Sequence, residues 1–219
     1  MITLIRKDLR QMRLPFLMSA ALFVAPAVIV TIGWMFYPDN NGPSGMWYEV
    51  VASLALVGAY LCTIGAALPS AVAFAGERRD RTAEFVATLP VSRLRIVMSK
   101  AIVSLAAAAW PWMLALALAA LVVDWKEQGV AEPVPWALCA SVALFGLAWL
   151  CSSLMESEVF SAAISIVCVT ILAFGAWVLT DRAKLTQHET RLLYFTLLPA
   201  VGIGGFVAGT IIALRRVSP

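Results

Sequence analysis

The most chemically varied part of the 219-residue sequence is a charged run over residues 76–95. Thr82 is placed to cap a helix, and Glu84 falls in the first turn of that helix, where the positive end of the helix dipole favours an acidic side chain. Pro90 ends the helix, because the residue before a proline is pushed out of the helical region. The run therefore predicts a helix of about two turns over residues 83–89.

One face of this predicted helix is apolar. Phe85, Val86 and Leu89 share it when each residue turns the helix by about 100°. A short helix of this kind either lies in the lipid interface or inserts into a groove of a partner protein. The residues leave both uses open, with the lipid interface slightly favoured. Ser92 follows Pro90 and is placed to cap the next helix, which continues into the apolar stretch 101–123.

Other kinds of chemistry are excluded by residue type. His188 is the single histidine, so neither a haem held between two histidines nor a zinc site built on a histidine pair is possible. No lysine follows a glycine, which excludes the Walker A loop that binds ATP. We therefore expect no enzymatic activity and no cofactor in this chain. The cysteines lack C-x-x-C spacing and are expected to be packing residues: Cys62, Cys139, Cys151 and Cys168.

The composition requires a membrane. Hydrophobic residues make up 62% of the chain and charged residues 13%, with a mean hydropathy of +0.88. A soluble domain has about 45–50% apolar and roughly 25% charged residues. A water-soluble fold is thus excluded, as are disorder, a disulfide scaffold and a basic nucleic-acid binder.

Stretches of about 20 apolar residues are long enough to cross a hydrocarbon core of ~30 Å as helices. Their apolar character is continuous and does not alternate as in a barrel strand. The prediction is an all-α integral membrane protein with a single transmembrane domain over residues 1–219 and six transmembrane helices. The expected spans are 16–37, 50–75, 101–123, 136–154, 160–180 and 194–214.

The basic residues predict the orientation. Twelve of the sixteen lysines and arginines fall in the N-terminal segment, the connection 76–100 or the C-terminal tail. Basic residues favour the cytoplasmic side, so both termini are predicted to be cytoplasmic. Residues 1–15 have one apolar and one basic face, which indicates an interfacial elbow helix whose basic side chains reach lipid headgroups.

The run 77–93, together with Lys100, resembles the second–third cytoplasmic connection of ABC type-2 permeases, the membrane subunits of ATP-binding-cassette exporters. The pattern in that family is a Glu, a small residue with Thr, an apolar helix, Leu-Pro-Val-Ser-Arg and a Lys seven residues later. Arg81 departs from it, at a place where glycine is common. The matching residues here are Glu77, Thr82, Leu89-Pro90-Val91-Ser92-Arg93 and Lys100.

The resemblance implies a half-transporter in a prokaryotic plasma or inner membrane. Two permease subunits would pair, as a homo- or heterodimer, and separate ATPase subunits holding ATP and Mg²⁺ would dock below them. The helix 83–89 would be the coupling helix, within a cytoplasmic coupling segment 76–100. Its apolar face would fill the ATPase groove, with polar contacts around it from Glu77, Arg78, Glu84 and Arg93. The expected ATPase-coupling residues are Glu77, Arg78, Thr82, Glu84, Phe85, Val86, Leu89, Pro90, Ser92, Arg93 and Lys100.

Two alternatives to a permease are weighed. A non-transporting membrane scaffold or assembly factor could use the same segment to recruit a cytoplasmic partner. A secondary carrier is disfavoured because no predicted span contains an ionisable residue away from its ends.

Three further sequence features predict details of the structure. Thr186-Gln187-His188-Glu189 is a capping-box pattern, which begins either a separate outer helix or a long, kinked sixth helix. Gly205 and Gly209 form a small-xxx-small pair suited to close packing within the chain. Trp110-Pro111-Trp112 either lines a cavity or packs in the core, and core packing is favoured.

Overall fold

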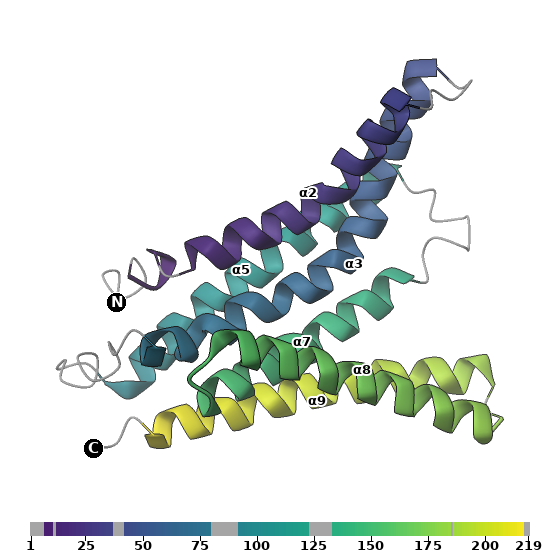
Figure 1. Ribbon diagram of the computed structural model, residues 1–219. Coiled ribbons are helices and arrows are strands. Elements are labelled where there is room, and N and C mark those ends of the chain that lie inside the picture. The colour runs from purple at the N-terminus through teal and green to yellow at the C-terminus, as the bar shows by residue number, and fades with distance from the viewer. Residues whose placement is uncertain are drawn as a thin grey trace.

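The protein is a bundle of long helices (Figure 1). The computed structural model describes residues 7–10, 12–36, 42–79, 92–122, 133–184 and 186–216, and no strand occurs in these ranges. Six helices in them contain a stretch long and apolar enough to cross a membrane, which confirms the predicted all-α class and its six spans. The helices are α2 (Arg13–Phe36), α3 (Gly42–Arg79), α5 (Arg93–Val122), α7 (Pro133–Leu154), α8 (Glu158–Arg182) and α9 (Gln187–Arg216).

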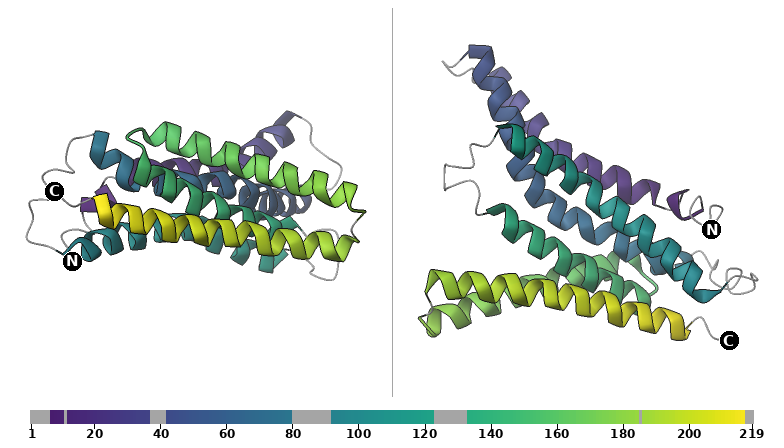
Figure 2. Two further views of the ribbon diagram at one scale, coloured as in Figure 1. Left: turned by 90° about the horizontal axis from the view of Figure 1, so that it is seen from below. Right: turned by 180° about the vertical axis from the view of Figure 1, so that it is seen from behind.

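Helix α3 is the centre of the bundle and contacts α2, α5, α7 and α8. Figures 1 and 2 show α2, α3 and α5 on one side, α8 and α9 on the other, and α7 between them. The two groups lie together at one end of the molecule and diverge towards the other. We call the end where the two groups lie together the basic end. There α2 begins at Arg13, α3 ends at Arg79, α5 begins at Arg93 and α9 ends at Arg216. The cytoplasmic location of this end remains a prediction.

A tryptophan-centred core joins the two groups near the basic end. Trp149 on α7 is fully buried, and its ring meets Phe74 of α3 edge to face, with 4.8 Å between ring centroids. Its indole Nε1 donates a hydrogen bond to Thr210 Oγ1 of α9 at 3.2 Å. Buried tryptophan combines a large apolar surface with one polar group that needs a partner. Both requirements are met here, which fixes α7 against α3 and α9.

Helices α7 and α9 pack backbone to backbone through glycines. A Cβ atom added to Gly146 would lie 1.8 Å from the carbonyl oxygen of Gly202, and one added to Gly205 would lie 2.9 Å from that of Gly146. A Cβ atom added to Gly209 would lie 2.9 Å from the backbone of Leu150 and 2.8 Å from Cδ1 of the Trp149 ring. The small-xxx-small pair Gly205 and Gly209 thus serves packing within the chain.

The capping box at the start of α9 is formed as predicted. Thr186 N donates to Glu189 Oε2 at 2.9 Å, and Glu189 N donates to Thr186 Oγ1 at 3.3 Å. The helix then continues through Pro199 to its end at Arg216. Of the two alternatives, the structure has the single long sixth helix.

The cysteines and Trp112 pack as expected, whereas Trp110 lines an open groove. All four cysteines are free thiols. Trp112 is buried, and its Nε1 donates to Ser141 Oγ at 2.9 Å, which links α5 to α7. Trp110 stacks on Phe16 of α2 instead, with ring centroids 4.8 Å apart.

Candidate functional site

The expected ATPase-coupling residues divide into two groups. Glu77, Arg78, Ser92, Arg93 and Lys100 are described by the structure and flank the coupling helix predicted from the sequence. We call these five residues the base of the coupling segment. The other six lie outside the described residues: Thr82, Glu84, Phe85, Val86, Leu89 and Pro90.

On the exit side of the segment, α5 begins where the sequence places it. The carbonyl of Ser92 accepts a hydrogen bond from Arg95 N at 2.9 Å, so Ser92 occupies the N-cap position of α5. Ser92 and Arg93 are both exposed at the basic end. Their side chains are therefore accessible to a protein that docks at this end.

Glu77 is turned into the bundle. Its residue is 6% exposed, and Lys100 on α5 is 2% exposed. The Lys100 Nζ lies 3.0 Å from Glu77 Oε1, and Lys7 Nζ reaches the same oxygen at 2.7 Å. One carboxylate thus holds together three separate parts of the chain. It acts inside the protein rather than on its surface.

Asp8 completes this group with a second negative charge. It is 4% exposed, accepts a hydrogen bond from Ser99 Oγ, and lies 3.9 Å from Lys100 Nζ. Lys100 also donates to the carbonyl of Ala73 at 2.7 Å. Burial raises the pKa of the Asp8 carboxyl, while Lys100 and Ser99 act in the opposite direction. Lys7, Asp8, Glu77, Ser99 and Lys100 form what we call the buried ion network.

The network balances its charges. Two lysines face two carboxylates, and the buried groups engage one another or the backbone. Burying a charge is costly unless the charge is paired and hydrogen-bonded, so removal of Lys100, which approaches both carboxylates, should cost most. The arrangement therefore fixes where α3, α5 and the N-terminal segment meet.

Sequence reasoning did not identify Lys7, Asp8 or Ser99 as members of a site. The signal available was the spacing of Asp8, Met12, Pro15 and Ser19, which follow one another at intervals of four, three and four residues. All four are buried, whereas Leu9 is 56% exposed. An acidic residue in register with a buried helical stripe indicates a buried partner.

Arg78, the neighbour of Glu77, reaches the opposite side of α3. Its guanidinium donates to the carbonyl oxygens of Met155 at 3.0 Å and Ser153 at 2.5 Å. These carbonyls lie at the end of α7, where the carbonyl oxygens of the last turn have no N–H donor within the helix. An arginine here satisfies them and also complements the negative end of the helix dipole.

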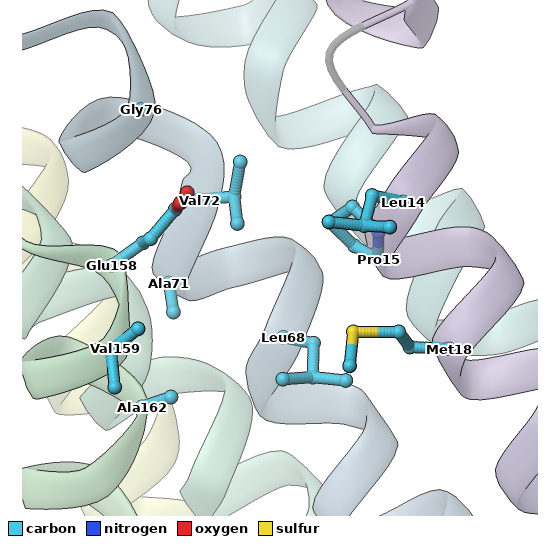
Figure 3. A pocket seen from close by; sticks show the side chains of 10 residues that line it. All are labelled: Leu14, Pro15, Met18, Leu68, Ala71, Val72, Gly76, Glu158, Val159 and Ala162. Carbon is cyan, nitrogen blue, oxygen red and sulfur yellow. The ribbon is translucent and has the colours of Figure 1, made fainter. Parts of the chain in front are cut away.

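An open cavity lies beside the base, between α2 and α8 with α3 as its floor (Figure 3). Its volume is about 470 Å³ and its lining is mostly apolar, including Met18 of α2, Leu68 of α3 and Val159 of α8. Glu158 points towards α3 beside Gly76, and a Cβ on that glycine would lie 3.8 Å from Glu158 Oε2. The cavity therefore combines an apolar surface with a carboxylate.

The described ranges contain six helices apolar enough to cross a membrane, and buried ion pairs join two of them, α3 and α5, to the N-terminal segment. The chain is therefore a multi-pass membrane protein. A family model described as ABC-2 family transporter protein matches residues 6–175, more than three quarters of the chain. The chain belongs to this family and is a membrane-spanning permease. No curated protein and no solved structure gave a significant match.

Proposed function

We propose that the chain is the permease subunit of an ATP-driven exporter in a prokaryotic plasma or inner membrane. It forms part of the translocation path and couples through segment 76–100 to a separate ATPase subunit, which binds ATP and Mg²⁺. Membership of the ABC-2 transporter family supports the ATPase partner. The chemistry of nucleotide hydrolysis then belongs to that partner.

The observation that carries the proposal is the pair of contacts made by two adjacent residues at the end of α3. Glu77 binds Lys100 of α5 and Lys7, whereas Arg78 binds the end of α7. A movement of the end of α3 therefore acts on both groups of helices at the end where they meet. Packed helices and buried ion pairs transmit such a movement because they resist continuous deformation.

The proposed partner in the membrane is a second permease subunit, seated over the cavity between α2 and α8. In the apolar stretch of α8, 17% of the residues are buried, and in that of α2, 22%. The corresponding share for α3 is 61%. The two most exposed helices thus flank the cavity. A second subunit would turn this open surface into one side of an enclosed path.

Replacing Phe85 with Asp tests the coupling helix. We expect the partner ATPase to bind at least about a hundred-fold more weakly, because a carboxylate in an apolar groove loses its hydration without gaining a partner. The measurement is co-purification of the two subunits from membranes. Ala87→Asp, on the opposite side of the same predicted helix, is the matched control and should keep the complex.

Vesicle export separates the proposal from the scaffold and the carrier. An ATP-driven permease exports cargo only with ATP and continues to do so when a proton uncoupler is added. Unchanged co-purification and ATPase activity in Phe85→Asp would contradict the coupling role. Binding of a cytoplasmic partner without ATP-dependent export would instead identify a scaffold.

The orientation is tested by labelling single cysteines. In a variant without the four native cysteines, a membrane-impermeant maleimide should label His188→Cys from outside and Glu84→Cys only from inside. His188 is exposed at the start of α9, so its labelling reports sidedness rather than burial. Labelling of both positions from the same side would overturn the predicted topology.

A further inference from the structure

A second groove lies on a different face of the bundle, between residues 9–17 and α5. Its volume is about 1170 Å³. Arg10 and Arg13 line one part of it, and Phe16, Trp110 and Met113 line the rest. The groove therefore has a basic part, next to the basic end, and an apolar part.

The depth of the groove matches one leaflet of a bilayer. Its residues on α5 run from Ile102 to Met113, which corresponds to about 16 Å at a rise of ~1.5 Å per residue. Half of a hydrocarbon core of ~30 Å has about the same depth. Arg13 begins the apolar span of α2, which puts the basic part of the groove at the level of the lipid headgroups.

The space exists because the wall on α5 is made of small residues. Ala106 and Ala107 face the groove where α2 presents Phe16 and Leu17. Ala106 is exposed and Ala107 is buried. Trp110, stacked on Phe16, forms an aromatic part of the lining. Alanine methyl groups between larger side chains leave open space along this wall of the groove.

The arginines give the groove its charge selectivity. Arg10 and Arg13 are exposed, and no described acidic residue forms an ion pair with either. Asp8, the nearest acid in the sequence, is turned away into the buried ion network. Two uncompensated guanidinium groups above an apolar channel complement a phosphate headgroup joined to an acyl chain.

We propose that this groove binds one anionic phospholipid of the surrounding leaflet, with its phosphate at Arg10 and Arg13 and one acyl chain along Phe16, Ala106 and Trp110. A second copy of the chain fits the site poorly. In a two-fold interface the same patch meets itself, which would bring the two arginine pairs together. The proposal does not depend on what the permease transports.

The test uses the full-length protein in nanodiscs that contain phosphatidylglycerol and phosphatidylcholine with identical acyl chains. Native mass spectrometry should find one retained phosphatidylglycerol per chain, preferred about ten- to thirty-fold over phosphatidylcholine, because each basic residue adds a modest attraction. The double variant Arg10→Gln/Arg13→Gln should lose this preference. Ala106→Phe should lose the retained lipid while keeping the arginines.

Matched controls distinguish specific lipid binding in the groove from general attraction of anionic lipid to surface charge. Arg93→Gln/Arg95→Gln removes two exposed arginines from the same end outside the groove, and lipid retention should not change. If Ala106→Phe does not fold, Leu17→Trp fills the same channel from α2. Equal loss in both arginine pairs, or retention in a filled groove, would overturn the proposal. A filled groove that changes the oligomer mass but not the lipid count would identify a second copy as the occupant.

Discussion

Replacing Lys100 with methionine should destabilise the protein by about 3–5 kcal/mol, the usual cost of removing one partner from a buried ion pair. Glu77 and Asp8 are both less than a tenth exposed, and Lys100 is the cation that both of them approach. Without it, Lys7 is the one lysine of the buried ion network that still faces the two carboxylates. The measurement is the midpoint of thermal unfolding of the purified protein in lipid nanodiscs.

A control and a double variant decide whether the effect comes from the network. Arg95→Met removes an exposed cation five residues earlier on the same helix and should change stability by less than about 0.5 kcal/mol. Adding Asp8→Asn to Lys100→Met removes the buried carboxylate that has lost its lysine partner, so the double variant should be more stable than Lys100→Met alone. Equal unfolding midpoints for Lys100→Met and Arg95→Met would show that the ion network does not hold the helices.

The buried ion network is better explained by the way it positions the helices than by a gain in folding stability. Replacing a whole buried ion pair with apolar residues of similar volume often costs nothing. What an ion network adds is a defined arrangement, since each charge tolerates few other positions. At the end of α3 this arrangement ties the chain on both sides of residues 80–91 to the N-terminal segment and to α7. The coupling proposed above requires a link at this place.

The spans were predictable because hydropathy is a local property. About 20 consecutive apolar residues require a membrane helix whatever the neighbouring segments are. The capping box at Thr186 and the start of α5 after Ser92 are local in the same sense, and both lie where the sequence predicts them. The full length of α3 was not predictable, because a helix can continue beyond the apolar stretch that identifies it.

The contacts that build the site depend on residues far apart in the sequence. Lys7 and Glu77 are separated by 70 positions, and Arg78 reaches a carbonyl 77 positions later. No periodicity connects such residues, so the sequence named Glu77 and Lys100 without pairing them. The coupling residues on the predicted helix 83–89 lie outside the described residues and stay a prediction.

Replacing Gly146 with alanine should destabilise the protein by at least the roughly 1–3 kcal/mol typical of an overpacked core. The added Cβ would lie 1.8 Å from the carbonyl oxygen of Gly202, and backbone atoms cannot turn aside as a side chain can. Gly202→Ala should act in the same way, since its Cβ would lie 2.3 Å from the carbonyl oxygen of Val142. Either variant must separate α7 from α9 and so loosen the packing around Trp149. Thermal unfolding in nanodiscs measures the effect.

Gly204→Ala and Gly175→Ala are the matched controls, because a Cβ at either glycine meets nothing within 4 Å. Both glycines lie inside helices, where alanine is favoured over glycine by about 1 kcal/mol, so these variants should be neutral or slightly more stable. The opposite signs expected for Gly202→Ala and Gly204→Ala, two residues apart on α9, distinguish close packing from helix propensity. If all four variants raised the unfolding midpoint, propensity alone would govern these positions and α7 and α9 could not pack as closely as the structure describes.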